Sequence, residues 1–146
     1  MSGNRIFRGP IDEAPRSVSK PVAGAYLPGL LVTIGASTLT QAINATGRLA
    51  ILAHRDFYSQ DTSTAYTSGE TGIAYRIKPD DEFQGLFAAG TYTFGQELTI
   101  NASGQLAAAA STNTVVAFFD DKAKAGVAQT ANSLCDVVIA NFYVKA

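Results

Sequence analysis

From Leu30 onward, clusters of Gly, Asn, Asp and Ser cut the chain into short apolar segments. The segments have about five residues each, which is typical of strands in all-β domains. Side chains also alternate, since Tyr75 and Ile77 share one side of an extended segment while Arg76 and Lys78 share the other. The pattern predicts an all-β fold, either a β-sandwich or a small, jelly-roll-like barrel. We expect strands near residues 30–34, 38–43, 49–54, 73–78, 83–88, 91–94, 97–101, 105–109, 114–119, 126–129 and 136–144.

Two segments between these strands have a different character. Residues 120–126 begin with acids and continue with lysines, an order that suits one short helix. Residues 59–71 are polar and rich in hydroxyl groups, and they predict a long exposed loop. Long loops in compact domains usually contact something, so this loop is a candidate for recognition.

Residues 1–28 hold four of the five prolines and show no periodicity. Proline removes backbone donors and biases the preceding residue toward extended conformations. We therefore expect an extended N-terminal arm, followed by a single β domain over residues 29–146. Such an arm is either disordered in solution or laid against a neighbouring molecule, and its apolar residues favour the second. The candidate contact residues are Ile6, Phe7, Arg8, Ile11 and Val18.

The last expected strand, residues 136–144, is apolar on both faces. Such a strand is either central in a sheet or an edge that a partner chain covers. We expect Phe142 and Tyr143 to be mostly buried, with at least one of them near a subunit contact in a homo-oligomer.

The charge balance excludes some partners. The chain has 11 Lys and Arg against 12 Asp and Glu. No basic field is available for phosphates or anionic lipids, so we expect no nucleic acid and no membrane as partner. No apolar run approaches the roughly 20 residues of a membrane span, and the N-terminus lacks the apolar region of a signal peptide. We expect the protein to stay in the compartment where it is made.

The sequence carries few residues suited to catalysis or metal binding. His54 could be a general base oriented by Asp56, but no nucleophile motif accompanies it. Cys135 is the only cysteine and lies in an apolar setting, which predicts a buried structural thiol. One His and one Cys cannot form a zinc site of four nitrogen and sulfur ligands. The acidic runs 80–82 and 120–121 fit solvated turns better than a calcium loop. We expect no enzyme activity, no cofactor and no metal.

The order of turns and strands between Thr71 and Ala108 resembles that of another group of proteins. The order begins with a strand, a Pro-Asp-Asp-Glu turn and an apolar strand that ends in Ala-Ala-Gly. It continues with a polar-aromatic strand, Gly-Gln-x-Leu and Ser-Gly-Gln-Leu. This succession resembles the capsid decoration, or cement, proteins of tailed bacteriophages, although the family usually has Gly-Asp where this chain has Gly95-Gln96. The matching residues are Asp81, Glu82, Phe83, Leu86, Gly90, Gly95, Leu98, Gly104 and Leu106.

The resemblance implies a structural protein on the outer surface of a phage head, made in the host cytoplasm. It implies binding to the major capsid protein and a homo-oligomer, with a trimer favoured and a dimer possible. The alternative is a non-enzymatic binding module, such as a glycan-recognising β-sandwich or a phage fibre piece, which would use the loop 59–71.

Overall fold

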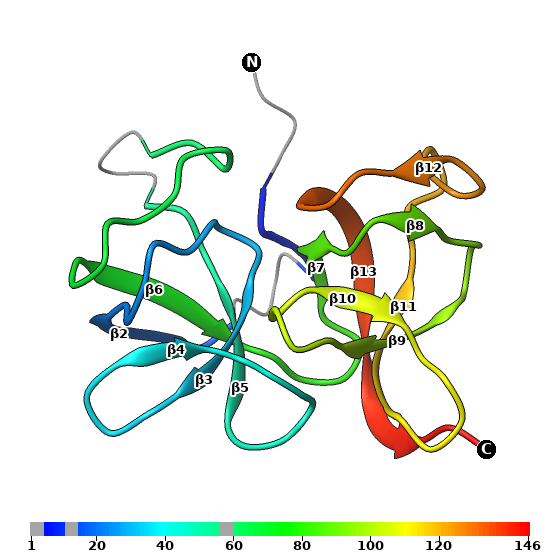
Figure 1. Ribbon diagram of the computed structural model, residues 1–146, viewed down its shortest axis with the longest axis horizontal. Coiled ribbons are helices and arrows are strands. Elements are labelled where there is room, and N and C mark those ends of the chain that lie inside the picture. The colour runs from blue at the N-terminus through cyan, green and yellow to red at the C-terminus, as the bar shows by residue number, and fades with distance from the viewer. Residues whose placement is uncertain (1–4, 11–14, 56–59) are drawn as a thin grey trace.

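The computed structural model describes residues 5–10, 15–55 and 60–146, and these residues form strands and turns without a helix (Figure 1). The predicted all-β class is confirmed. The strands are β1 (Phe7–Gly9), β2 (Ser17–Pro21), β3 (Leu31–Ile34), β4 (Leu39–Gln41), β5 (Leu49–Leu52), β6 (Thr71–Arg76), β7 (Glu82–Phe87), β8 (Gly90–Thr91), β9 (Glu97–Ile100), β10 (Leu106–Ala108), β11 (Thr114–Phe119), β12 (Ala128–Gln129) and β13 (Ser133–Val144).

The C-terminal half of the chain closes into a small barrel. Its strands follow the order β7-β10-β9-β11-β13, and β13 pairs again with β7. All these pairings are antiparallel except β10 with β7, which meet at Leu106 and Phe87. Three aromatic rings fill the interior, since the centroids of Tyr92 and Phe119 lie 4.9 and 5.5 Å from that of Phe87. Edge-to-face pairs of this kind each stabilise a core by about 0.5–1.5 kcal/mol beyond their buried area.

The N-terminal half forms a second curled sheet in the order β2-β6-β5-β3-β4. Its two outer strands approach each other, because Val22, directly after β2, forms a parallel bridge with Leu39 of β4. The enclosed side chains include Val32, Leu39 and Leu52, which are all buried. The molecule therefore consists of two β-lobes side by side (Figure 1).

Backbone contacts and a shared core join the two lobes. The amide of Leu86 in β7 donates to the carbonyl of Gly29 at 2.9 Å. Leu31 and Ile51 of the N-terminal lobe belong to the same buried cluster as the barrel interior. Gly29 allows this close approach, since a Cβ there would lie 2.6 Å from Cδ2 of Leu134 in the barrel. The shared buried cluster favours a fixed relation between the lobes.

Ten of the eleven segments that the sequence predicted as strands match one, with several bounds shifted by one to three residues, whereas 91–94 shares only Thr91 with β8. The short helix expected at 120–126 is wrong. These residues form turns in which the Asp121 carbonyl accepts hydrogen bonds from the amides of Lys124 and Ala125. Gly126 then adopts a φ of 76°, which ends any helical continuation.

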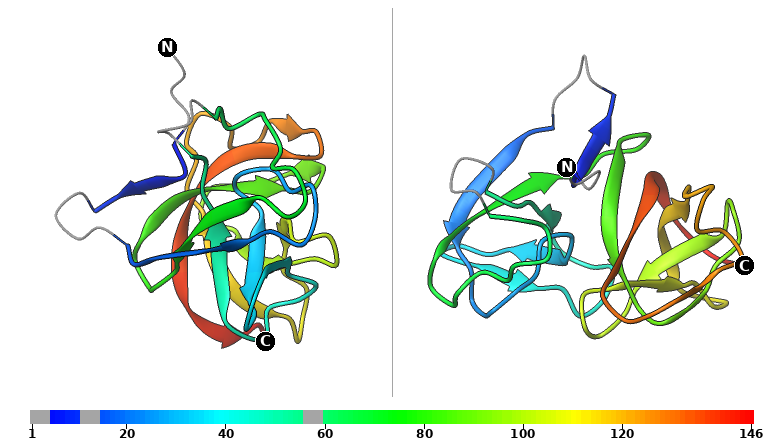
Figure 2. Two further views of the ribbon diagram at one scale, coloured as in Figure 1. Left: turned by 90° about the vertical axis from the view of Figure 1, so that its left-hand side faces the viewer. Right: turned by 90° about the horizontal axis from the view of Figure 1, so that it is seen from above.

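The boundary expected at residue 28 is also wrong. β1 pairs with β7 of the barrel, and β2 pairs with β6 of the other lobe over all five of its residues. Figure 2 shows β1 and β2 running along the two lobes as extended strands. Proline is compatible with this arrangement because Pro21 ends β2 and Pro10 follows β1, so neither interrupts a strand.

Candidate interaction surface

Charged residues are distributed unevenly along the chain. Residues 21–47 contain no Asp, Glu, Lys or Arg, and residues 98–119 contain none either. The first run supplies β3 and β4, and the second supplies most of β9 together with β10 and β11. Our interpretation of the sequence considered only the net charge. The length of these two runs was the signal that could have revealed the surface described next.

The fold places the two charge-free runs side by side across the lobe boundary. The Leu31 amide donates to the carbonyl of Gly104 at 3.0 Å, and Nε2 of Gln41 donates to the carbonyl of Ala102 at 3.3 Å. Gly104 has a φ of 73°, and a Cβ there would lie 3.0 Å from the Leu31 carbonyl oxygen. Only glycine satisfies both the conformation and the close contact.

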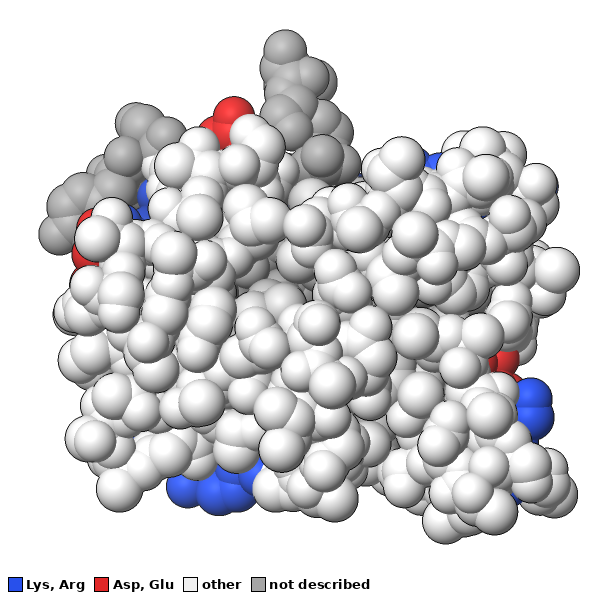
Figure 3. All heavy atoms as spheres, viewed as in Figure 1, with Lys and Arg blue, Asp and Glu red and all other residues white. Residues whose placement is uncertain are grey.

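We call the exposed residues of runs 21–47 and 98–119 the neutral face. In Figure 3, most of the visible surface is free of charged side chains, and the few that appear lie mainly toward its margins. Its exposed members include Thr40, Ile43, Ala102, Ser103 and Ala108. Small, weakly polar side chains cost little to desolvate, and a depletion of charge is characteristic of the central part of protein interfaces.

A second exposed feature is the C-terminal half of β13. The strand pairs with β7 from Ser133 to Val138, and the amide of Ile139 still donates to the carbonyl of Asp81. In the described residues, the part beyond Ile139 pairs only with β11, so its other edge is open. We call residues 140–144 the open edge.

The open edge exposes apolar side chains. Phe142 is 42% exposed, Tyr143 40% and Val144 64%. The expectation that Phe142 and Tyr143 are mostly buried is thus not met within a single chain. Tyr143 is held in place, since its hydroxyl donates to Oε2 of Glu97 at 2.6 Å. An unpaired strand edge with apolar side chains and no charged residue lacks the usual protection against pairing with another strand.

The contact residues expected in the N-terminal arm have different surroundings. Ile6 is 1% exposed and belongs to the barrel core, so the expectation that it contacts a capsid is wrong. The ring of Phe7 packs edge-to-face on Phe83 at 5.5 Å. Arg8 forms an ion pair with Asp136 at 3.5 Å, and Val18 is half-buried against the core of the N-terminal lobe. Ile11 lies outside the described residues.

Only one member of the pair considered for catalysis, His54 and Asp56, is described. His54 is half-buried after β5, and Asp56, its expected partner, lies outside the described residues. Cys135 is buried in the barrel core, and this burial raises the pKa of its thiol to about 11. A thiol with that pKa is a poor nucleophile at neutral pH. The described residues hold no group of three His, Cys, Asp or Glu that could bind a metal ion.

The acidic turns are less solvated than expected. Asp81 is buried, and its amide and carbonyl both form backbone hydrogen bonds, to Lys78 and Ile139. Asp121 is also buried, and its Oδ2 accepts a hydrogen bond from the Asp136 amide at 3.1 Å. The backbone of Asp81 and the carboxyl group of Asp121 therefore fix these turns against β13.

The described part of the loop expected at 59–71 is anchored rather than wholly exposed. Tyr66 is buried, and its hydroxyl donates to the Ala53 carbonyl at 2.7 Å. The guanidinium of Arg55 lies 4.9 Å from the centre of the Tyr66 ring. Arg55 also pairs with Glu70 at 2.9 Å, and hydrogen bonds from Thr67 and Arg55 hold the pKa of Glu70 below its usual value. The loop thus has a fixed base.

Fold and surface together describe a two-lobed all-β protein with one neutral face and one open edge. No family model and no curated protein matches the chain. No helix that could cross a membrane occurs in the described residues.

Proposed function

We propose that the protein is a structural capsid decoration protein, which binds the outer surface of a phage head and stabilises contacts between major capsid protein subunits. The observation that carries this proposal is the neutral face, which extends over both lobes. A broad rigid surface that is cheap to desolvate suits a permanent contact with another protein. The resemblance of residues 71–108 to cement proteins supplies the identity of the partner.

The proposed mechanism is the selective binding of the assembled shell. A protein that binds the shell and not its dissociated subunits stabilises the shell by mass action. If the open edge joins copies into a homo-oligomer, each oligomer presents several neutral faces at once. Contacts that are weak singly then add up to a high overall affinity.

Co-sedimentation with heads assembled from the major capsid protein of the same genome tests this proposal. The variant Ala108→Glu puts one charge on the exposed end of β10 within the neutral face. We expect it to weaken binding at least tenfold, since a buried unpaired carboxylate is costly. The matched control is Ala123→Glu, which adds the same charge at an exposed position between Lys122 and Lys124.

Two outcomes would contradict the proposal. One is the absence of the unmodified protein from sedimented heads over a range of concentrations. The other is equal binding of Ala108→Glu and the unmodified protein, which would place the contact elsewhere. Thermal unfolding of both variants must match that of the unmodified protein before binding is compared.

A further inference from the structure

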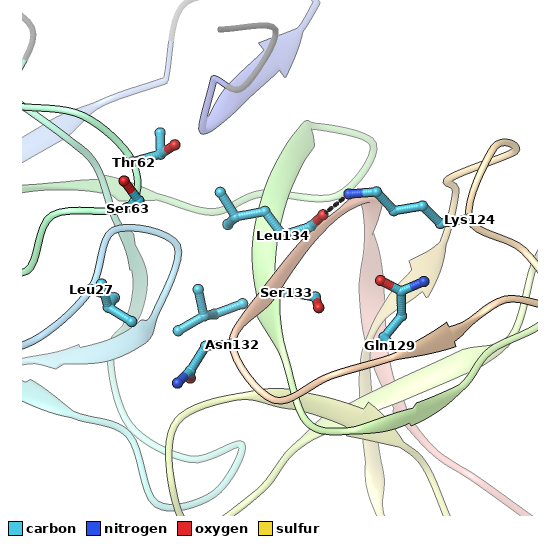
Figure 4. Close-up of a pocket in the computed structure, with 9 residues that line it drawn as sticks. Leu27, Thr62, Ser63, Lys124, Gln129, Asn132, Ser133 and Leu134 are labelled. Atoms are coloured by element: carbon cyan, nitrogen blue, oxygen red, sulfur yellow. Dashed lines mark hydrogen bonds between the residues drawn. The ribbon is translucent and has the colours of Figure 1, made fainter.

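A cleft of about 370 Å³ lies between the two lobes, at the side where the loop 60–70 approaches the turn before β13 (Figure 4). Leu27, Thr62 and Ser63 line it from the N-terminal lobe, and Asn132 and Leu134 line it from the barrel. Figure 4 shows Gln129 and Lys124 on the far side of the segment that carries Ser133. The volume lies in the lower part of the range of about 300–1,000 Å³ that is usual for ligand pockets. It is sufficient for one small ring-shaped ligand.

A chain of amide hydrogen bonds fixes the orientation of the Asn132 side chain. Oδ1 of Asn101 accepts from the amides of Ser103 and Gln105, so its Nδ2 must donate to Oε1 of Gln105, at 3.2 Å. Nε2 of Gln105 in turn donates to Oδ1 of Asn132 at 2.8 Å. Nδ2 of Asn132 makes no hydrogen bond to any described residue. Its two donor hydrogens are therefore available to a ligand.

Other polar groups around the cleft are oriented as acceptors. Ser63 gives its hydroxyl hydrogen to Asp61 at 2.7 Å, and Ser133 gives its own to the Thr130 carbonyl at 2.8 Å. Nε2 of Gln129 donates to the Val127 carbonyl at 3.0 Å, which leaves Oε1 of Gln129 as an acceptor. Each of these oxygens keeps lone pairs that a ligand hydroxyl could use.

The charge of the lining restricts the ligand class. Among the described residues that line the cleft, only Lys124 is charged, and its ammonium donates to the Leu134 carbonyl. One cation that already has a hydrogen-bond acceptor is a weak anion site compared with the clusters that bind phosphate groups. Three leucines, Leu27, Leu86 and Leu134, add an apolar part to the lining.

We propose that this cleft between the lobes binds a neutral sugar, one ring at a time. A sugar hydroxyl both donates and accepts, which matches a lining that offers a donor at Asn132 and acceptors at Ser63 and Ser133. The C–H face of a sugar ring packs against the leucines. None of the described residues that line the cleft is aromatic, so we expect a low affinity for a single ring, with a Kd of about 1 mM or weaker. This site is independent of the capsid contact proposed above.

The test is a titration of the full-length, ¹⁵N-labelled protein followed by NMR. The probes are methyl α-D-glucopyranoside, methyl β-D-galactopyranoside and N-acetylglucosamine, each up to about 50 mM, a range chosen for millimolar dissociation constants. We expect saturable shifts with at least one probe at the amides of residues 62–63 and 129–134 and at the side-chain amide of Asn132. N-acetylneuraminic acid is the charged comparison.

The decisive variant is Asn132→Asp. It keeps the oxygen that accepts from Gln105 and removes the donor that makes no hydrogen bond to a described residue, so we expect affinity to fall about tenfold. The matched control is Asn113→Asp, because the Oδ1 of Asn113 also accepts a hydrogen bond, from the Ala110 amide at 2.8 Å, in a turn remote in sequence from the cleft residues. This control should bind like the unmodified protein.

Three results would overturn the proposal. The first is the absence of saturable shifts at the cleft with all three neutral probes. The second is binding of N-acetylneuraminic acid alone, which would assign the cleft to a carboxylate through Lys124. The third is an equal effect of Asn132→Asp and Asn113→Asp, which would reflect added charge and not the lost donor.

Discussion

At the scale of single residues, Tyr66 holds the described part of the loop before β6. Its ring is buried in the N-terminal lobe, its hydroxyl donates to the Ala53 carbonyl, and this burial raises the pKa of the hydroxyl. A buried hydroxyl is tolerated only because it has a hydrogen-bond partner. Tyr66 thus holds the loop so that Thr62 and Ser63 line the cleft. The sequence had predicted that Tyr66 lies in an exposed segment.

The variant Tyr66→Phe tests this role. It leaves the Ala53 carbonyl without that donor, so we expect the free energy of unfolding to fall by about 1–2 kcal/mol in urea denaturation. Tyr143→Phe is the matched control, because it removes a hydrogen bond of similar length at an exposed site. We expect that change to stay within about 0.5 kcal/mol. Equal effects in the two variants would show that Tyr66 does not anchor the loop.

At the scale of elements, β1 and β2 make the N-terminal segment part of both lobes. β2 is an outer strand of the N-terminal sheet, and Val22 after it is buried against Gly72 and Leu39. A Cβ on Gly72 would lie 2.6 Å from Cγ1 of Val22, so the two residues are in tight contact. This packing contradicts the idea that the segment can be removed without consequence.

We therefore expect deletion of residues 1–25 to abolish cooperative thermal unfolding, because the N-terminal lobe loses one of its five strands. Val22→Ala is the milder variant, and it should lower the free energy of unfolding by about 1–3 kcal/mol. Circular dichroism during heating measures both. A truncated chain that melts like the full-length protein would show that residues 1–25 form a separate arm.

At the scale of the whole molecule, the open edge of β13 is a strand edge that has no pairing partner among the described residues of a single chain. Strand edges of this kind pair readily with another extended strand. We expect the unmodified protein to self-associate at about 50 µM, a concentration above many specific dissociation constants. Phe142→Asp should give a monomer, because it places a charge on the edge that pairs.

Analytical ultracentrifugation distinguishes the outcomes. Phe94→Asp is the matched control, since Phe94 is also a largely exposed phenylalanine but lies in the turn between β8 and β9. That variant should associate like the unmodified protein. A well-folded monomer of the unmodified protein at the same concentration would mean that the open edge is covered only on the capsid.

The strand order along the chain followed from the sequence, since turn residues and local alternation are visible without tertiary contacts. The helix at 120–126 failed for a physical reason: the acid chosen as a helix start, Asp121, instead caps a turn and binds the Asp136 amide of a distant strand. Local charge order cannot report such a contact. The arm residue Ile6 failed similarly, because its burial depends on packing against the distant barrel strands.

The sequence by itself determined the all-β class and the approximate positions of ten strands, because both depend on neighbouring residues. It also contained the two charge-free runs that our interpretation passed over. Only the tertiary structure decided that these runs lie together, through Gly104 and Leu31, and that Asn132 and Ser63 line the same cleft. It also decided that β1 and β2 belong to different sheets. Each of these features joins residues far apart in the chain, and such pairings are set by the packing of the whole molecule.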